Sequence, residues 1–560
     1  MKEYGFILFV LAVFIIFAIQ AYRSKKEAIR QLEEKINNNY GNKLKRKYDN
    51  GEIEKISHFH EYVKEKYQSR EVIDDITWND LNMDEIFKDL NNTYSSVGEE
   101  YLYDMLRTLK NTEDLKEFDS IVSYLYEHEN EAKNIQKKCN GIGYSRKVSL
   151  YEYIHRLTDL EKKSNLKHYI QIVAMIAATA SLLIIPEIGI ACFIAVLSYN
   201  IITYYNQKRD IELYFSCFKH LINLLSVSKR LEKELSDEFD FYKKELVLAC
   251  KNLKSLENGV FVISTGLDGS ISEVIMDYAR MIFHLDIIKF NSMLQVAIDK
   301  MEYIDKLFLA VGRLEAAAAI ASYRKYLTTK YEEYCTPDII EDDKLKIEFE
   351  DIYHPLIDEP VKNSLKENRG VLLTGSNASG KSTFLKTVAI NAIFARTIYT
   401  CTAKKYVTSP FVIYSSMALR DDLNNHESYY IVEIKALKRI IDATGSSPMM
   451  CFVDEVLRGT NTVERIAASS EILKSLSGSN TLCFAATHDI ELTHILEKQY
   501  SNYHFEESII ENDIFFNYLL KKGRATTRNA IKLLKVMGYD DKIIEDAQLL
   551  ADKFIETGTW

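Results

Sequence analysis

Proline is distributed very unevenly along this chain of 560 residues. Five of its six prolines lie between Pro337 and Pro448, and Pro186 is the sixth. Because proline removes a backbone donor and clashes with the preceding turn, helix interiors rarely tolerate it. The nearly proline-free first part therefore predicts a mostly helical structure, and the sequence divides near residue 340 before any motif is considered.

Length and composition narrow the class of protein. At about 150 residues per domain, the chain has room for three or four domains. Hydrophobic residues make up 47% and charged residues 27%, which excludes global disorder and collagen-like repeats. The formal net charge of −10 provides no whole-molecule attraction for nucleic acid, so DNA contact would require a local basic patch. The eight cysteines show neither a zinc spacing nor a compact disulfide framework, which fits a reducing compartment.

The N-terminal region contains an almost unbroken apolar run over residues 4–21. About 20 apolar residues span a bilayer, so we predict a transmembrane anchor over residues 1–23. The basic segment Arg23–Lys26 follows the run and only Lys2 precedes it, which predicts that the rest of the chain lies in the cytoplasm. The alternative is a cleaved signal peptide, although no small-x-small cleavage site stands out.

A second apolar stretch covers residues 169–202, and Pro186-Glu187 splits it into runs of 17 and 15 residues. Basic residues flank both ends: Lys162, Lys163, Lys167, Lys208 and Arg209. This pattern favours a membrane hairpin that enters and leaves on the cytoplasmic face. Because each half is short for a full span, a buried core helix pair or an interfacial hairpin remains the alternative.

The other parts of the N-terminal region are charged or helix-periodic. We interpret residues 24–84 as a charged juxtamembrane helical segment and residues 85–340 as a long-helix core or lever domain carrying the hairpin. Residues 208–257 and 280–335 both show helical periodicity. No His, Cys or carboxylate cluster in this region has a catalytic or metal-ligand spacing, so the region predicts a mechanical role.

A phosphate-binding motif begins after residue 370. Residues 371–374 read as a buried strand, the pattern G-x-x-x-x-G-K-S follows, and an apolar-periodic helix continues from Thr383. Backbone N–H groups of such a loop wrap phosphates, and the helix N-terminus adds its positive dipole end. Lys381 would reach the β- and γ-phosphates, and the Ser382 hydroxyl would ligate Mg²⁺. The predicted nucleotide-binding residues are Gly375, Ser376, Asn377, Ala378, Ser379, Gly380, Lys381, Ser382 and Thr383.

Two further strands end in polar side chains that suit this chemistry. Residues 449–453 form an apolar strand pattern that ends in Asp454 and Glu455. Asp454 fits a carboxylate that helps to hold Mg²⁺. Glu455 fits the base that orients the attacking water. A third strand over residues 481–487 ends in His488, which would sense the γ-phosphate.

Five ordered motifs resemble those of the MutS family. The quoted segments are GSNASGKSTFLK, FVDEVLRGTNTVE, ATHDIELT, the HP lead-in at residues 354–363, and DDLNNHESYYIVEI. The last segment places Ser428 at the family's signature serine, which contacts the γ-phosphate bound by the other subunit. The resemblance covers about 345–560 strongly and extends more weakly over 85–335, where SSVGEEYLYDMLR and VGRLEAAAAIASYR are similar to parts of the helical core.

The resemblance implies a multidomain α plus α/β fold with a C-terminal P-loop NTPase domain of the ABC-ATPase type at 345–560. It implies an ATP hydrolase that uses ATP and Mg²⁺, with Glu455 and His488 as catalytic residues and Ser382 and Asp454 on the metal. It also implies a homodimer, with Arg458, Gly459, Thr460 and Thr462 on the loop that faces the partner, and DNA as the usual ligand. Together with the apolar runs, this predicts a protein of the cell membrane whose ATPase domain faces the cytoplasm.

Departures from the family pattern bear on function. We expect no mismatch-reading N-terminal domain with a Phe-x-Glu wedge, because membrane-like sequence occupies the region before residue 85. We also expect no Smr-like nuclease domain after residue 560. The apolar hairpin is an insertion relative to soluble members. Mismatch reading by the usual wedge is therefore not expected.

Two hypotheses follow for the function. The first is a membrane-anchored, dimeric ATPase that closes helical levers around DNA, whether mismatched or branched. The alternative is an ATP-gated membrane-associated clamp for protein with no DNA ligand. An ABC transporter is disfavoured, because no LSGGQ-type segment precedes the acidic strand and three short apolar runs cannot line a solute path. A basic cluster over residues 521–535 is the one local candidate for phosphate contacts, although its sequence favours a solvated basic helix face or a dimer contact.

Overall fold

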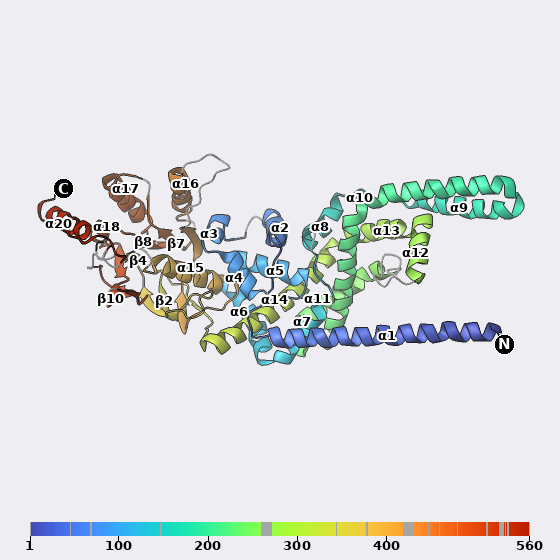
Figure 1. Ribbon diagram of the computed structural model, residues 1–560, viewed down its shortest axis with the longest axis horizontal. Coiled ribbons are helices and arrows are strands. Elements are labelled where there is room, and N and C mark those ends of the chain that lie inside the picture. Colours follow the sequence, from blue (N-terminus) through green and yellow to red (C-terminus); the bar gives the residue numbers. More distant parts are fainter. Residues whose placement is uncertain are drawn as a thin grey trace. The chain divides into compact units, whose positions relative to one another are not determined.

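The chain forms two compact units, each described here by itself (Figure 1). The helical unit contains residues 1–68, 91–104 and 121–325, and the sheet unit contains residues 69–90, 105–120 and 326–560. The computed structural model describes residues 2–44, 46–67, 70–145, 148–258, 271–342, 344–376, 379–417, 429–445, 447–457, 460–478, 480–510, 513–525, 531, 534 and 537–558. Within these ranges every β-strand lies after residue 337, so the expected mixed α and α/β character is confirmed at this level.

Helices account for the regular structure of the helical unit. Its main elements are α1 (Lys2–Asn39), α2 (Glu52–Lys66), α5 (Ser96–Arg107), α6 (Thr112–Glu127), α7 (Glu129–Cys139), α8 (Leu150–His155), α9 (Leu166–Ile184), α10 (Pro186–Glu234), α11 (Asp240–Leu253), α12 (Ile271–Phe283), α13 (Leu285–Asp299) and α14 (Met301–Tyr331). Helices α5, α6 and α14 run past the limits of this unit. The predicted anchor falls in α1, but the side chains of residues 2–18 lie outside the description, so the anchor remains a prediction.

Close packing between α5 and α14 organises the core of the helical unit. A Cβ on Gly98 would lie 2.5 Å from the Glu315 carboxyl carbon, so a larger residue at position 98 would displace the Glu315 carboxylate. Glu315 is fully buried and accepts hydrogen bonds from the Tyr94 amide and the Ser95 hydroxyl, each at 2.5 Å. Burial raises the pKa of Glu315 to about 7. The two motifs that resemble the family's helical core therefore pack against each other.

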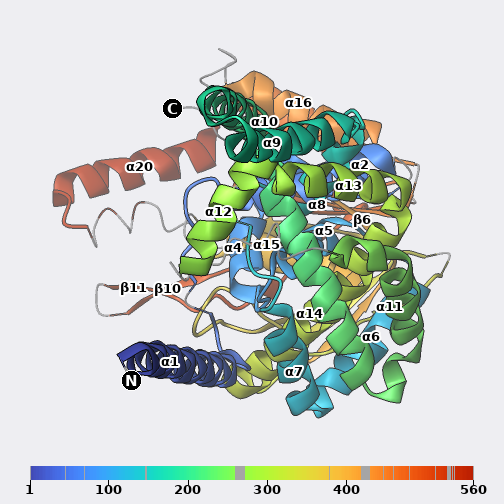
Figure 2. The same cartoon turned by 90° about the vertical axis from the view of Figure 1, so that its right-hand side faces the viewer.

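The apolar stretch at residues 169–202 folds as a hairpin of two helices, and its insertion into a membrane stays a prediction. Helix α9 ends at Ile184, Ile185 forms the turn, and α10 starts at Pro186, where proline is favoured because its missing N–H would be unpaired anyway. Only 22% of the apolar window of α9 and 17% of that of α10 is buried. Figure 2 shows these helices beside α12 and α13. This exposure argues against a buried core helix pair.

A six-stranded sheet forms the centre of the sheet unit. Its order is β12 (Lys521–Lys522), β9 (Tyr500–His504), β4 (Gly370–Thr374), β8 (Thr481–Ala486), β7 (Met449–Asp454) and β6 (Val412–Ser416). All neighbours pair in parallel except the edge strand β12. Connecting helices are α15 (Lys381–Thr397), α16 (Tyr429–Asp442), α17 (Thr462–Ser475) and α18 (Ile490–Ile495), and α20 (Asp541–Thr557) lies near the C-terminus.

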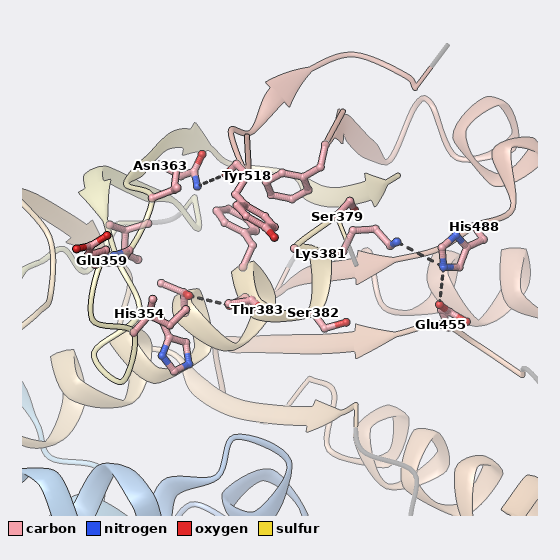
Figure 3. A pocket seen from close by; sticks show the side chains of 18 residues that line it. His354, Glu359, Asn363, Ser379, Lys381, Ser382, Thr383, Glu455, His488 and Tyr518 are labelled. Carbon is pink, nitrogen blue, oxygen red and sulfur yellow. Dashed lines mark hydrogen bonds and ion pairs between the residues drawn. The ribbon is translucent and has the colours of Figure 1, made fainter. Parts of the chain in front are cut away.

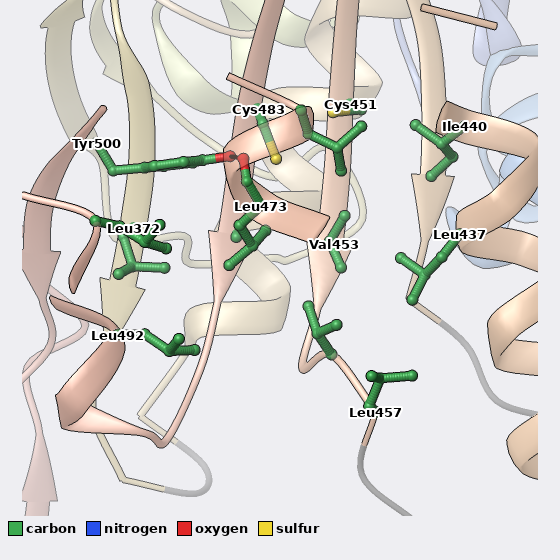
Figure 4. Packing of buried hydrophobic residues seen from close by; sticks show 14 of the residues in the cluster. Leu372, Leu437, Ile440, Cys451, Val453, Leu457, Leu473, Cys483, Leu492 and Tyr500 are labelled. Carbon is green, nitrogen blue, oxygen red and sulfur yellow. Dashed lines mark hydrogen bonds between the residues drawn. The ribbon is translucent and has the colours of Figure 1, made fainter. Parts of the chain in front are cut away.

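One face of this sheet packs on helices to form a continuous apolar core (Figure 4). Strands contribute Leu372, Val453 and Cys483, and helices contribute Leu437 and Leu473, all buried. The Tyr500 hydroxyl lies inside this core and donates to the Leu473 carbonyl oxygen at 2.7 Å. Burying these side chains holds the strand ends of the sheet in fixed positions.

Two smaller sheets complete the β-structure. One has the order β1 (Asp338–Ile339), β5 (Lys405–Thr408), β2 (Ile347–Ile352) and β3 (Asn363–Glu367), with a bulge between Phe349 and Ile352. The other is the antiparallel pair β10 (Glu507–Ile510) and β11 (Asp513–Phe516). The turn from β2 to β3 brings residues 354–363 to the phosphate-loop pocket.

A short segment from the N-terminal half covers the edge strand β6. It comprises α3 (Asp75–Asp80) and α4 (Met83–Leu90), which belong to the sheet unit although they precede most of the helical unit in sequence. The buried Asp80 carboxylate accepts from the Ser415 hydroxyl at 2.7 Å and from the Met417 amide at 2.8 Å. This grouping cuts across the predicted boundary at residue 84.

Candidate functional site

Three neighbouring strand ends bring the predicted phosphate-loop and acidic residues to one edge of the sheet. Strand β8 lies between β4 and β7, and Ala486 is in register with both Leu373 and Asp454. Gly375 lies two residues after Leu373, and His488 lies two residues after Ala486. Glu455 directly follows Asp454. Figure 3 shows the resulting pocket with Lys381, Ser382, Glu455 and His488 around it.

Two glycines shape the phosphate loop. Gly375 and Gly380 have φ angles of 147° and 99°, in the region that other residues rarely adopt. A Cβ on Gly375 would also lie 2.9 Å from the Phe505 carbonyl oxygen. Helix α15 starts at Lys381, directly after this turn, so its N-terminus points into the pocket. Asn377 and Ala378 lie outside the described residues.

Lys381 bridges the loop from inside. Its Nζ donates to the carbonyl oxygens of Gly375 and Ser376, both at 2.8 Å, and lies 3.4 Å from His488 Nε2. His488 Nε2 is also 2.9 Å from Glu455 Oε1. One ring nitrogen cannot donate to a carboxylate and accept from an ammonium at once. The shorter contact indicates that Nε2–H donates to Glu455, while the lysine is held by the loop carbonyls.

The donor set for a magnesium ion is assembled at the start of α15. The Ser382 hydroxyl donates to Asp454 Oδ2 at 2.5 Å, so the two oxygens converge from the loop and from the end of β7. Hydroxyl and carboxylate oxygens are the ligands that Mg²⁺ prefers. Ser379 is buried, and its hydroxyl has no hydrogen-bond partner within the described part of the chain. Thr383 is exposed and lines the pocket.

The backbone after β7 adopts an unusual conformation. Glu455 and Leu457 have φ angles of 58° and 60°, which costs free energy for residues with a Cβ. Two hydrogen bonds hold this turn: the Glu455 amide donates to the Ala486 carbonyl at 2.9 Å, and the Leu457 amide donates to Glu433 Oε1 at 2.5 Å. The strained turn aims the Glu455 side chain at the pocket, next to Lys381 and His488.

The pocket extends beyond the phosphate loop into a wall with apolar and aromatic side chains. Its volume is about 700 Å³. The wall is built from Ile352, Ile357, Pro360, Val361, Phe505 and Tyr518. Asn363 holds the Tyr518 segment in place, because its side-chain amide donates to the Tyr518 carbonyl at 3.0 Å and accepts from the Leu520 amide at 2.7 Å. A flat, partly apolar ligand next to a phosphate group would fit this shape.

His354 borders the same wall as a neutral imidazole. Burial and the nearby Lys386 charge lower the pKa of His354 to about 4. Its Nδ1 accepts a hydrogen bond from the Leu356 amide at 3.2 Å, which requires that nitrogen to be unprotonated. The histidine of the HP lead-in therefore stays uncharged at neutral pH.

Several residues of the site were not assigned a role from sequence. No motif in the sequence marks Tyr518. Glu433 lies in the quoted segment DDLNNHESYYIVEI but received no role there, and Asp489 directly follows His488. Asp489 forms a two-point ion pair with Arg465 of α17, at 2.6 and 3.0 Å, and so braces the residue beside His488. The position of Asp489, a polar residue directly after a strand-end motif, was the sequence signal that could have assigned it to the site.

The residues predicted to face a partner subunit are described only in part. Ser428, Arg458 and Gly459 lie outside the described residues. Thr460 precedes α17, its hydroxyl donating to Glu464 at 3.4 Å, and Thr462 is the exposed first residue of that helix. Their predicted role toward a second subunit stays a prediction.

Comparison with known proteins decides the family. Residues 371–555 match the family model described as MutS domain V. The chain belongs to the MutS family. The matched part begins within β4 and includes the phosphate loop, the strand end at Asp454 and His488, whereas the pocket residues of the segment 352–363 precede it.

The curated relatives share this region at low identity. DNA mismatch repair protein MutS of Thermotoga maritima is 25% identical over 296 residues, which are 48% of this chain and 37% of the relative. The proteins of that name from Pseudothermotoga lettingae and Natronomonas pharaonis are 28% and 27% identical, over 44% and 47% of this chain and 31% of each relative. The chain thus spans about a third of the length of these MutS relatives.

Proposed function

We propose that the chain binds ATP with Mg²⁺ and hydrolyses it in the domain V pocket. The observation that carries the proposal is the convergence of Lys381, Ser382, Asp454, Glu455 and His488 at adjacent strand ends. Phosphate oxygens would replace the carbonyl oxygens of Gly375 and Ser376 as partners of the Lys381 amine. The wall around Tyr518 would then contact the base.

Each polar side chain has one task in this mechanism. Mg²⁺, when bound, neutralises charge on the β- and γ-phosphate oxygens. Ser382 and Asp454 would hold that ion. Glu455 would accept the proton of the attacking water, and the His488 contact orients the Glu455 carboxylate. The strained turn at Glu455 fixes the position of this base before substrate arrives.

The ATPase proposal is tested with the full chain purified in detergent. The Lys381→Ala variant should lose ATP binding and turnover together, because the charge that faces the phosphates is removed. Lys474→Ala is the matched control, since Lys474 lies on α17 and, among the residues that the structure describes, its amine pairs only with Glu471 three residues away. Wild-type binding and turnover in Lys381→Ala would contradict the site.

The proposed function includes attachment to the cell membrane with domain V in the cytoplasm. Support comes from the apolar run at residues 4–21 and from the hairpin at residues 169–202, whose helices are long and apolar enough to cross a bilayer. Basic residues flank both segments on the same predicted side. Carbonate extraction of membranes that contain the full chain should leave it in the pellet, and release into the supernatant would contradict the attachment.

The proposal further assigns the chain to a homodimer that acts as an ATP-gated clamp on DNA. The relatives carry the name DNA mismatch repair protein MutS, and this supports DNA as the ligand. The domain V match and the position of Ser428 in the quoted motif support two facing ATP sites. Long helices such as α10 and α14 would act as the levers.

The alternative, a clamp for protein with no DNA ligand, is favoured by one observation. The described residues of the basic cluster already have acidic partners: Lys521 pairs with Glu506 at 2.5 Å and Arg524 with Glu497 at 3.0 Å. Arg528, Lys532 and Lys535 lie outside the described residues. Phosphate binding by this cluster would have to compete with these ion pairs.

A binding experiment separates the two ligands. The full chain in detergent is titrated with duplex and branched DNA, with and without ATP, over a series of salt concentrations. DNA binding predicts an affinity that falls steeply with salt, because counterions are released from each contacted phosphate. No binding at low salt in either nucleotide state would overturn the DNA part and leave the protein clamp.

A further inference from the structure

Helix α12 (Ile271–Phe283) has no part in the proposed ATPase or clamp. It presents one apolar face outward: Val274, Ile275 and Tyr278 are 51%, 64% and 59% exposed. Residues at these spacings share one side of a helix. On another side, Arg280 is buried and donates to Asp277 at 2.6 Å. An apolar strip of this kind on a surface helix calls for a partner.

The position of α12 relative to the hairpin is fixed by hydrogen bonds. The Asn200 side chain on α10 donates to the Ile282 carbonyl at 3.0 Å, and His284 Nε2 lies 2.9 Å from the Asn200 carbonyl oxygen. These contacts attach the end of α12 to α10 at the level of Asn200. Figures 1 and 2 show that α12 crosses the hairpin instead of running along it.

The chain bends sharply after α12, which decides between two roles for this helix. Residues 274–283 and 285–299 are bent by 71° at His284, whose φ angle is 55°. On the far side of the bend, Phe290 and Leu294 of α13 are buried in the helical unit. Helix α13 is therefore a core helix, so the pair is no broken transmembrane span. Helix α12 alone, at about 20 Å, is too short to cross a hydrocarbon layer of about 30 Å.

We infer that α12 lies in the membrane interface, with its apolar face in the acyl boundary of a phospholipid bilayer, and limits how deeply the hairpin inserts. The inference rests on the membrane attachment proposed above. A helix that crosses an inserted hairpin lies parallel to the bilayer plane, as interfacial helices do. From Asn200 to the tip at Ile185 the hairpin extends about 22 Å, less than the hydrocarbon thickness of about 30 Å. The tip therefore ends inside the bilayer.

Charge and surface continuity identify lipid as the partner. Exposed apolar side chains continue from α12 onto both hairpin helices, where Ile176, Ile188 and Ile194 are also exposed. A bilayer covers such a surface on all sides at once. The exposed Arg209 lies nine positions beyond Asn200 on α10, about 14 Å toward water, where anionic headgroups would meet it, while the neighbouring Lys208 pairs with Asp286.

A fluorescence depth measurement tests this placement in proteoliposomes of phosphatidylcholine and phosphatidylglycerol that contain the full chain. Cys192 near the hairpin tip is exposed, whereas Cys335 is half-buried and the other six cysteines are buried, so Cys192 accepts an environment-sensitive thiol probe. For α12 the probe is placed in a Cys192→Ser, Ile275→Cys double variant. Cys192→Ser, Ile543→Cys on α20 is the matched control at an exposed isoleucine of the sheet unit. Lipids carry a quencher at a shallow or a deep acyl position.

The inference predicts three different patterns of fluorescence loss. The probe at Cys192 should lose most signal to the deep quencher, the probe at residue 275 should lose most to the shallow one, and the probe at residue 543 should lose little to either. If residue 275 behaves like residue 543 while Cys192 is quenched, the placement of α12 is overturned and the hairpin stands. Deep quenching at residue 275 would equally overturn it. If Cys192 is not quenched, the membrane hairpin itself fails.

Retained ATP binding by each labelled variant shows that its sheet unit is folded. The N-terminal run at residues 4–21 keeps the chain on the liposome independently of the hairpin under the proposed function. Loss of quenching therefore reports a change of depth and not loss of the protein from the membrane.

Discussion

The helical unit and the sheet unit use buried carboxylates in opposite ways. In the helical unit, Glu315 and Glu100 are buried among N–H and O–H donors, and burial raises their pKa values to about 7 and about 8. In the sheet unit, Glu455 lines the pocket and contacts His488, and the buried Asp454 accepts a hydrogen bond from Ser382, which also lines the pocket. The first pair joins segments of backbone, whereas the second is placed where a cation and a phosphate would meet it. Burial with satisfied donors makes a carboxylate structural, and an open pocket keeps it available for chemistry.

The largest effect is expected at Glu455. Glu455→Gln should lower ATP turnover about 10²- to 10⁴-fold and retain ATP binding, because the amide cannot take the proton of the attacking water. Single-turnover hydrolysis and nucleotide binding are measured on the same preparation. Glu471→Gln, at the surface of α17, is the control that should keep wild-type turnover. Unchanged turnover in Glu455→Gln would place this residue with the structural carboxylates.

A large loss of stability is expected at Glu315. Glu315→Ala leaves the Tyr94 amide and the Ser95 hydroxyl without their buried acceptor, at a cost of about 1–3 kcal/mol each. Denaturant unfolding of the full chain in detergent measures the change. Glu302→Ala, an exposed position on the same helix, should have little effect. Equal stability of both variants would show that the Glu315 contacts do not hold α5 to α14.

A smaller effect is expected at Tyr518, where the pocket has its aromatic wall. Tyr518→Ala should weaken ATP binding about 2- to 10-fold through lost stacking, and Tyr518→Phe should bind as the wild type does. Triphosphate alone lacks a base, so its affinity should be the same in all three proteins. A matching loss for triphosphate would locate Tyr518 at the phosphates and not at the base.

The smallest effect is a pH dependence of stability in the helical unit. Glu100 and Glu315 have raised pKa values in the folded state, so between pH 5 and 8 the folded state holds protons that the unfolded state has released. Raising the pH through this window therefore lowers the free energy of unfolding. Thermal unfolding at pH 6 and pH 8 should show the lower midpoint at pH 8. The Glu100→Gln, Glu315→Gln double variant should flatten this difference, and an unchanged slope would contradict the assignment.

Local sequence patterns predicted part of the candidate site, but they did not predict which residues from distant segments complete it. The glycine spacing predicted the phosphate loop and a helix from Thr383, because those features depend on a few consecutive residues, and α15 in fact begins two residues earlier, at Lys381. The sequence order did not show that β8 lies between β4 and β7, and that order alone brings His488 within 2.9 Å of Glu455. Tyr518 comes from a distant segment that no local pattern marks, whereas Glu433 lies within a quoted motif but received no role from the sequence.

Apolar length and proline position predicted the hairpin over residues 169–202, because both act along a single helix. Its depth in a bilayer is a different matter. The depth of the hairpin depends on where α12 attaches to α10. That attachment is a hydrogen bond between Asn200 and Ile282, which lie 82 residues apart, so no local pattern predicts it. The same holds for Asp80, which binds the end of β6 although more than 330 residues separate them.

The sequence by itself determined the division near residue 340, the phosphate loop, the acidic strand end and the apolar hairpin. Each of these follows from backbone freedom, hydrogen-bonding capacity or hydropathy within a short segment. Only the tertiary structure decided which strand ends are neighbours, which buried carboxylates hold segments of backbone together, and which helix crosses the hairpin. Those outcomes depend on packing between segments far apart in the chain, where burial of apolar surface selects one arrangement from many.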